Sequence, residues 1–401
     1  MGKRILFINT VSGGSHGRIV ADLAVAAQAA GLETSFAYGR GPESSDRIGG
    51  PVDGALHLVA TRLFDAHGFA SSRTTRAFVQ RLKADPPDLI HLHNIHGYYL
   101  HIEILFEYLK ASGIPIVWTL HDCWAFTGHC SHFVRAHCKR WKEECSCCPM
   151  KGEYPASLLA DRSRSNYIRK MYAFTRAPRL RIVTPSRWLA EIAGMSFLKD
   201  YPINVIPNGV DLGAFSPGTE AAAEAWEIEP RRPLMLAVAS PFDHRKGFND
   251  TVSVAQSIPE ADAVLVGLTA KQIEGLSAKP NVRGMERTEN RKELIELYRR
   301  ADVLINTTYE DTYPTVNMEA IACGTPVAAY DTGGCVEQVT EGTGTLVRVG
   351  DTLGMADAVR SIINRPRGEA RSACRAHAEA AFDRTVAMRE YIGVYRSLLE
   401  E

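Results

Sequence analysis

The densest group of residues able to do chemistry lies between 307 and 327, where a polar loop separates two apolar runs. Asp311 comes just before a proline that suits the first turn of a helix, and Glu319 follows on the second turn. The N–H groups at such a helix start favour an anion, and the two carboxylates can accept hydrogen bonds from sugar and ribose hydroxyls. We therefore expect a site for a sugar nucleotide, with Asp311, Pro314, Thr315, Val316 and Glu319 as its contacts. The alternative is a helix cap followed by an exposed glutamate.

A second candidate is the cationic loop Ser240–Gly247, which follows the apolar run 234–239. A Lys or Arg side chain at the end of a buried strand can neutralise a phosphate group. We expect Lys246 to be the main phosphate contact, with Arg245 or a backbone group as the second donor. The alternative interpretation is ordinary surface charge.

The first half of the chain offers glycines and histidines at the ends of apolar runs. Gly13 and Gly14 follow the first run, where glycine allows a backbone to approach a phosphate or an acceptor. Their spacing is not that of a dinucleotide fingerprint. His121 and His93 each end an apolar run, which predicts a position at the carboxyl edge of a sheet. His121 would face the ligand and His93 would line acceptor space, although strand-end histidines are often structural.

Apolar runs of strand length alternate with helical patterns through most of the chain, which indicates parallel βαβ units and an α/β fold. The alternation starts afresh after residue 210, so we expect two doubly wound domains that bind ligands at the carboxyl ends of their strands. The predicted parts are residues 1–210 with an insert at 122–150, residues 211–384, and a C-terminal helix at 385–401 that packs back on the first domain.

Composition fits a globular protein of two domains, with 401 residues, 45% hydrophobic and 23% charged. The net charge is zero, but residues 1–210 carry +8 and the remainder −8. Residues 162–187 hold eight Lys or Arg and no acid, which predicts a basic face for an anionic membrane. No nucleic-acid partner is expected. Apolar runs are too short to span a bilayer and the start resembles no secretory signal, so a cytoplasmic location is expected.

The region 311–327 resembles the retaining, nucleotide-sugar-dependent glycosyltransferases of family four, which have the GT-B fold of two Rossmann-like domains. The family pattern is Glu, seven residues, Glu, then a small residue, Gly and Pro-Val, and Asp311 replaces the first acid here. Residues 240–247 are similar to the family's donor-phosphate loop, and residues 205–211 to its hinge. The matching residues of the main pattern are Glu319, Ala322, Gly324, Pro326 and Val327.

The resemblance implies transfer of a hexose from a nucleoside diphosphate sugar to a hydroxyl acceptor with retention, catalysed by His121, Lys246 and Asp311. Cationic side chains would replace a catalytic metal. The acceptor would be a saccharide, lipid-linked or part of a growing surface polysaccharide, at the inner face of the plasma membrane. Two alternatives are a non-catalytic protein that binds sugar nucleotides as the partner of another transferase, and a GT-B epimerase. An oxidoreductase is a third alternative, but the chain lacks the glycine fingerprint of a dinucleotide-binding site.

Six of the nine cysteines fall between residues 123 and 148, and a dense cysteine loop in a reducing compartment favours metal over disulfides. An insert of this length without regular structure can be ordered by a tetrahedral thiolate site. A subset of the family that this chain resembles has a similar four-cysteine stretch. We expect a structural zinc ion, with disulfides or reduced thiols as alternatives; its ligands would be Cys130, Cys138, Cys145 and Cys148.

Overall fold

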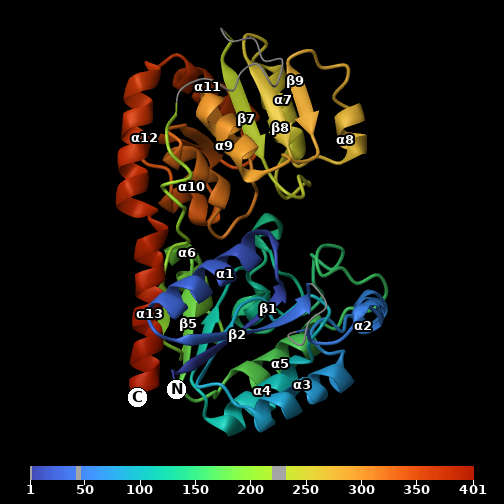
Figure 1. Ribbon diagram of the computed structural model, residues 1–401. Helices are drawn as coiled ribbons and strands as arrows, with labels where there is room; N and C mark the ends of the chain where they lie inside the picture. Colours follow the sequence, from blue (N-terminus) through green and yellow to red (C-terminus); the bar gives the residue numbers. More distant parts are fainter. Residues whose placement is uncertain (1, 42–46, 219–231) are drawn as a thin grey trace. The chain divides into compact units, whose positions relative to one another are not determined.

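The computed structural model describes residues 2–41, 47–218 and 232–401, which form two compact units. Unit 1 contains residues up to Ile206 together with Ala387–Glu401, and unit 2 is Pro207–Val386. Unit 2 is thus a continuous segment of chain, whereas unit 1 is built from two segments (Figure 1).

Unit 1 is built on a parallel sheet of six strands in the order β2-β1-β3-β4-β5-β6. Its central strands are buried on both faces, which is why the sequence shows short continuous apolar runs and no alternation. The strands are β1 (Arg4–Val11), β2 (Glu33–Arg40), β3 (Leu89–Leu92), β4 (Ile116–Thr119), β5 (Leu180–Thr184) and β6 (Ile203–Val205).

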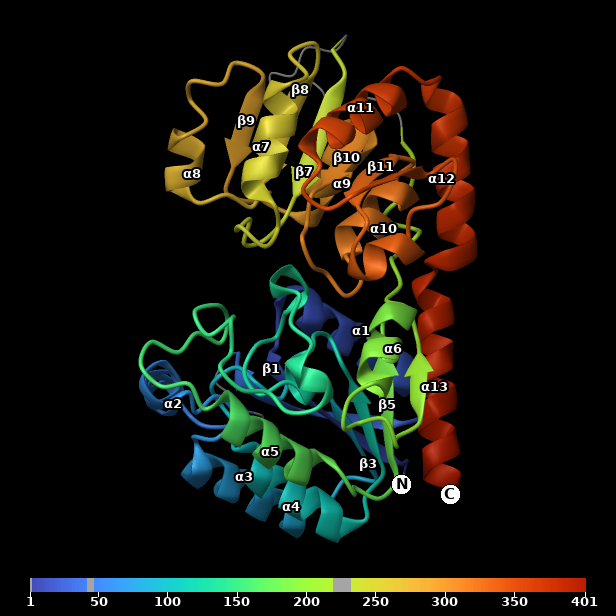
Figure 2. The same cartoon turned by 180° about the vertical axis from the view of Figure 1, so that it is seen from behind.

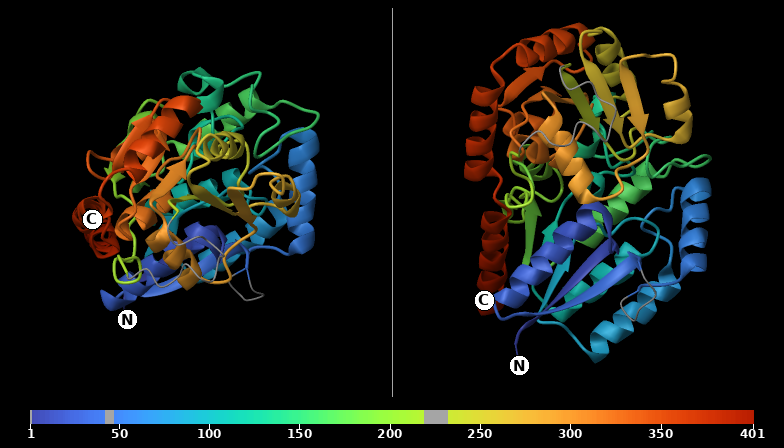
Figure 3. Two further views of the ribbon diagram at one scale, coloured as in Figure 1. Left: turned by 90° about the horizontal axis from the view of Figure 1, so that it is seen from above. Right: turned by 45° about the horizontal axis from the view of Figure 1, so that its top comes forward.

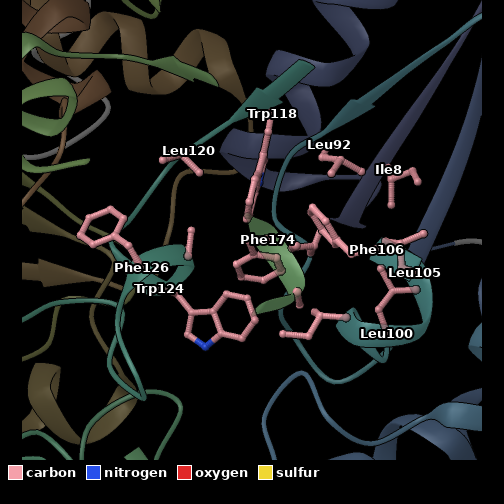
Figure 4. Close-up of a cluster of buried hydrophobic side chains, with 14 of the residues drawn as sticks. Ile8, Leu92, Leu100, Leu105, Phe106, Trp118, Leu120, Trp124, Phe126 and Phe174 are labelled. Atoms are coloured by element: carbon pink, nitrogen blue, oxygen red, sulfur yellow. The ribbon is translucent and has the colours of Figure 1, made fainter. Parts of the chain in front are cut away.

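Helices cover both faces of this sheet. On one face a cluster of large side chains joins the strands to α3, α4 and α5, with Phe174 packed against Trp118 and Phe106 at ring-centroid distances of 4.9 and 4.7 Å (Figure 4). On the other face α1 and α13 pack against β1. The helices are α1 (Gly14–Ala29), α2 (Pro51–Phe64), α3 (Ser72–Ala84), α4 (Ile102–Ser112), α5 (Ser163–Phe174), α6 (Arg187–Gly194) and α13 (Arg384–Glu400).

The cysteine-rich insert lies between β4 and α5 and contains three short 3-10 turns, η1 (Trp124–Phe126), η2 (Val134–Ala136) and η3 (Arg140–Lys142). Its start is anchored by Lys170 of α5, which is buried. The Lys170 ammonium donates to the carbonyl oxygens of Trp124 (2.8 Å) and Thr127 (3.0 Å) and lies 3.4 Å from the centre of the Trp124 ring. Burial lowers the pKa of Lys170 to about 7.

Unit 2 has a second parallel sheet of six strands, in the order β12-β11-β10-β7-β8-β9 (Figure 2). The order reverses between β7 and β10, the place where doubly wound sheets bind their ligands. The strands are β7 (Leu234–Val238), β8 (Asp262–Val266), β9 (Val282–Met285), β10 (Val303–Asn306), β11 (Val327–Tyr330) and β12 (Gly344–Val347).

Apolar clusters on the two faces of this sheet form the core of unit 2. Two doubly wound α/β units confirm the predicted fold class. None of the described helices is both long and apolar enough to cross a membrane. The helices of unit 2 are α7 (Phe248–Gln256), α8 (Ala270–Glu274), α9 (Arg291–Arg300), α10 (Thr315–Ala322), the 3-10 turn η5 (Gly333–Glu337), α11 (Thr352–Ile363) and α12 (Arg367–Ala381).

Candidate functional site

The two predicted binding loops of unit 2 meet where its strand order reverses. One loop follows β7 and the other follows β10, and these strands are neighbours in the sheet. The Tyr309 N–H donates to the Arg245 carbonyl oxygen at 2.8 Å, and the Thr307 hydroxyl donates to the Gly247 carbonyl oxygen at 2.9 Å. Gly247 has a φ of 73°, and a Cβ there would lie 2.0 Å from the Thr307 carbonyl oxygen. Glycine is therefore required for the two loops to touch.

Lys246 and Asp311 form an ion pair at this meeting point. Both side chains are mostly buried, at 19% and 17% exposure. Burial raises the pKa of Asp311, but the charge and hydrogen bond of Lys246 and the charge of Arg245 outweigh it, so the pKa lies below its ordinary value. The Arg245 guanidinium donates to the Glu310 carbonyl oxygen at 2.9 Å. The structure thus brings the adjacent residues Arg245 and Lys246 together with Glu310 and Asp311, each contact joining positions 65 apart in sequence.

The helix α10 begins at Thr315 directly after Pro314, where the sequence predicts it. No side chain caps its N-terminus in the described chain, so its first N–H groups can bind an anion. A chain of buried amides fixes this helix start: Asn306 donates to Asn317 at 2.8 Å, and Asn317 donates to Gln338 at 3.0 Å. The Gln338 amide in turn donates to the Pro314 carbonyl oxygen at 3.0 Å.

Glu319 and Val316 lie on the first two turns of α10, and both are partly buried. A Glu319 carboxylate oxygen accepts a hydrogen bond from the Tyr298 hydroxyl at 2.9 Å. Burial and the nearby carboxylate raise the pKa of Tyr298 well above its ordinary value, so the phenol remains a donor. Tyr298 therefore orients the carboxylate that the sequence assigns to donor binding.

A loop that the sequence analysis did not single out closes against Asp311. It is the start of η5, directly after β11, where the Gly334 N–H donates to the Asp311 carbonyl oxygen at 3.0 Å. A Cβ at Gly333 would lie 1.9 Å from that oxygen, and one at Gly334 would lie 2.0 Å from the Thr312 carbonyl oxygen. A Gly-Gly pair at the end of a strand was the available sequence signal.

In unit 1 the corresponding place lies at the ends of β1, β3 and β4. His93 and His121, from β3 and β4, form a 3.0 Å hydrogen bond between Nδ1 and Nε2, and the ring of His16 lies 4.6 Å from that of His121. Burial, reinforced by the neighbouring imidazoles, lowers the pKa of His93 and of His121 well below the ordinary value. All three residues belong to unit 1, and the buried pair is neutral near pH 7.

A small pocket in unit 1 is lined by His93, His96, His121 and Asp122. His96 lies 3.0 Å from a carboxylate oxygen of Asp122 and its other ring nitrogen lies 3.1 Å from the Tyr154 hydroxyl. The His93 Nε2 atom is buried and has no hydrogen-bond partner among the described residues. These side chains present hydrogen-bonding groups that suit the hydroxyls of a small polar ligand.

The glycines of the first loop lie at a helix start. The helix α1 begins at Gly14, and Gly13 is its N-cap. Gly14 has a φ of 72°, and nothing lies within 4 Å of a Cβ at either glycine. The tight turn also needs Gly17, where a Cβ would lie 2.6 Å from the Ser12 carbonyl carbon. The open space beside Gly13 and Gly14 is compatible with ligand contact.

The four predicted zinc ligands line one small cavity in the insert. Cys130 and Cys148 are neighbours in this cavity, and the interaction with the Cys130 thiol lowers the pKa of Cys148 below its ordinary value. All nine cysteines are free. Across the described part of the chain, no three Cys, His, Asp or Glu side chains are placed to hold an ion. The zinc site therefore stays a prediction.

The basic stretch 162–187 does not form one face. It runs through α5, β5 and the start of α6. Lys170 is buried, Arg169 pairs with Glu103, and Arg181 pairs with Glu401. The charges of consecutive elements thus point to different neighbours, and contact of this stretch with a membrane stays a prediction.

Comparison with known proteins agrees with this architecture. Residues 16–214 match the family model "Glycosyltransferase Family 4", and residues 219–381 match "Glycosyl transferases group 1". WcaC of Escherichia coli (strain K12), named as a colanic acid biosynthesis glycosyl transferase, is 23% identical over 415 residues, 98% of each chain.

Two solved structures share the fold. Sucrose-phosphate synthase from Thermosynechococcus elongatus has a TM-score of 0.76 at 21% identity and covers 99% of both chains. HepE of Anabaena, solved in complex with UDP-glucose, has a TM-score of 0.67 at 17% identity, over 98% of this chain and 99% of that one. The chain therefore belongs to the glycosyltransferases that have the GT-B fold.

Proposed function

We propose that this protein transfers a hexose from a nucleoside diphosphate sugar to a hydroxyl acceptor with retention of anomeric configuration. The observation that carries the proposal is the ion pair of Lys246 and Asp311 beside the start of α10. It combines a cation and a helix start without a side-chain cap, which suit a diphosphate, with a carboxylate that suits sugar hydroxyls.

In the proposed reaction the bond between the sugar C1 and the diphosphate oxygen breaks, and the acceptor oxygen bonds to C1 on the same face. The acceptor proton passes to the departing phosphate oxygen. Lys246 and the N–H groups at Thr315 and Val316 stabilise the charge that develops on the leaving diphosphate. Asp311 and Glu319 hold donor hydroxyls, and Arg245 supports the loop through the Glu310 carbonyl.

The neutral pair of His93 and His121 is suited to bind hydroxyl groups, because an imidazole with a lowered pKa both donates and accepts a hydrogen bond. We place the reacting sugar or acceptor hydroxyls at these histidines. We propose an acceptor that is lipid-linked or part of a growing surface polysaccharide; the similarity to WcaC, named for colanic acid biosynthesis, supports a saccharide acceptor.

The test begins with a thermal-shift screen of UDP-, GDP- and ADP-sugars, in which the true donor raises the melting temperature. The product formed from that donor is then examined by NMR for the configuration at C1. Retained configuration supports the proposal, and inverted configuration contradicts it. Donor binding without transfer or hydrolysis identifies a non-catalytic partner, whereas conversion of the donor into its epimer identifies an epimerase.

We also propose a structural zinc ion in the insert, supported by the cavity that the four cysteines share. Elemental analysis of protein purified without a metal resin measures it. About one equivalent of zinc is expected. A zinc content below about a tenth of an equivalent per chain, together with nine freely titratable thiols, would contradict the zinc proposal.

A further inference from the structure

Asp250 is a partly buried carboxylate next to the two binding loops of unit 2. It lies in the first turn of α7, where the positive end of the helix favours a negative charge. One of its carboxylate oxygens accepts hydrogen bonds from two phenols, that of Tyr309 at 2.8 Å and that of Tyr330 at 2.7 Å. A single carboxylate therefore joins three segments that are far apart in the sequence.

These three segments are the ones that form the candidate donor site. The strands β7, β10 and β11 are parallel neighbours, so the loops that follow them leave from one edge of the second sheet (Figures 2 and 3). Asp250 follows the loop after β7, Tyr309 lies in the loop after β10, and Tyr330 is the last residue of β11. The hydrogen bonds of Asp250 thus connect the segments that carry Lys246, Asp311 and Gly334.

Tyr309 holds the lysine loop and the aspartate loop together through both its backbone and its ring. Its N–H donates to the Arg245 carbonyl oxygen at 2.8 Å, and its ring centroid lies 5.8 Å from that of His244. Its carbonyl oxygen accepts from the Thr332 hydroxyl, which follows β11, at 3.0 Å. The position of the Tyr309 ring, which Asp250 fixes at the hydroxyl, therefore affects the spacing of the loops.

The bonds to Asp250 cannot be replaced easily by water at Tyr330, because this side chain is fully buried. Burial and the hydrogen bond to Asp250 raise the pKa of Tyr330 above its ordinary value, so the phenol remains a donor. A buried hydroxyl that loses its acceptor is unfavourable, and the surrounding chain tends to shift until a new partner is found. Loss of the carboxylate should therefore displace the loops that it joins.

We propose that Asp250 is a positioning residue for sugar transfer, which sets the spacing of the Lys246 ammonium group and the Asp311 carboxylate through Tyr309 and Tyr330. This inference rests on the proposed function, because it assigns Asp250 to the reaction of that site. Asp250 acts without touching the donor or the acceptor. The effect on the rate can still be large, since a shift of about 1 Å in a group that acts on the reacting atoms can cost about 100-fold.

Replacement of the carboxylate tests the proposal. Turnover is measured as release of the nucleoside diphosphate from the donor that the thermal-shift screen selects, because this measurement needs no identified acceptor. Asp250→Ala should lower kcat about 10- to 100-fold. Asp250→Asn should stay within about threefold of the wild type, because its amide oxygen can accept from both phenols.

Calorimetric titration with the free nucleoside diphosphate separates positioning from folding. The Asp250→Ala protein should still bind one nucleotide per chain, with a lower kcat at each site. A merely structural role would instead reduce the number of sites and leave the kcat of each site unchanged. Asp357→Ala is the matched control, since this carboxylate lies in α11 and is 82% exposed.

Tyr309→Phe keeps the ring and removes one hydroxyl, so it tests the proposal even if Asp250→Ala does not fold. It should lower kcat by about 3- to 10-fold, the effect of one lost hydrogen bond. In the Asp250→Ala protein the same substitution should have no further effect, because both changes remove the same bond.

A kcat per nucleotide site in Asp250→Ala that equals that of Asp357→Ala would overturn the proposal. So would an Asp250→Asn protein that is as slow as the alanine variant. A wild-type protein that binds the nucleotide but releases none from any donor would contradict the proposed function itself and, with it, a role of Asp250 in transfer.

Discussion

In the ion pair of Lys246 and Asp311, each side chain fixes the state of the other. The charge of Lys246 keeps Asp311 ionised despite its burial, and Asp311 holds the ammonium group at the end of β7. An incoming diphosphate offers the lysine a second anionic partner, while sugar hydroxyls offer the aspartate new donors. The pair is therefore well suited to exchange its mutual contact for contacts with a ligand.

Replacing Lys246 by Met should lower turnover about 100- to 1000-fold, because the developing charge on the leaving group loses its cation. Burial of Asp311 then acts unopposed by the lysine, so its pKa should rise and the acid limb of the pH–rate profile should move to higher pH. Steady-state kinetics across pH measure both effects. Lys271→Met, at an exposed position of α8, is the control, and wild-type turnover in a folded Lys246→Met protein would remove the leaving-group role.

At the scale of elements, the start of η5 supports the loop that carries Asp311. Gly334→Ala should displace that loop, because the new Cβ meets the Thr312 carbonyl oxygen at 2.0 Å. Donor affinity should fall, and the free energy of unfolding should drop by about 1–3 kcal/mol. Calorimetry with donor and urea unfolding measure the two effects.

Gly368→Ala provides the control for this substitution. Gly368 is in α12, is exposed, and has nothing within 4 Å of a Cβ. Alanine there should be neutral or stabilise the helix by about 0.5–1 kcal/mol. If both substitutions changed donor affinity and the free energy of unfolding equally, the loss of a glycine would explain the result. The clash with the Thr312 carbonyl oxygen would then play no part.

The sequence predicts an element well when the apolar residues in its pattern are also the residues that the structure buries. Strand ends follow from short apolar runs, and the meeting of residues 246 and 311 follows from parallel strands with loops at one edge. The outward orientation of the apolar residues of α2 could not be predicted, because a helical pattern alone does not show that His57 and Thr61 form its buried face. The contact of Gly334 with Asp311 was missed as well, since it depends on how β11 is registered against β10.

At the scale of the whole molecule, buried neutral histidines make stability depend on pH. Burial lowers the pKa of His67, His91, His93 and His121 well below the ordinary value. The unfolded chain takes up protons near pH 6.5, whereas these folded histidines do not. The free energy of unfolding should therefore fall as pH decreases from about 7 to 5, by up to about 1.4 kcal/mol per pH unit for each histidine.

Urea unfolding at several pH values measures this slope. His67→Gln should flatten it, because glutamine can still accept the Gly97 N–H that donates to His67 at 3.2 Å but takes up no proton. His137→Gln, at an exposed position, should leave the slope unchanged. An identical slope in the His67 variant would show that this histidine is protonated alike in both states.

The division of unit 1 into two segments has a consequence for its synthesis. Tyr391, Tyr395 and Leu398 of α13 complete the core on one face of the first sheet, and the Tyr395 hydroxyl lies 2.7 Å from His91 Nδ1. On the ribosome, residues 1–206 emerge first but lack these side chains until residues 387–401 follow. Unit 2 is continuous, so it can fold while the first sheet still waits for its closing helix. Residues 1–206 are thus made before unit 2 but finish folding after it.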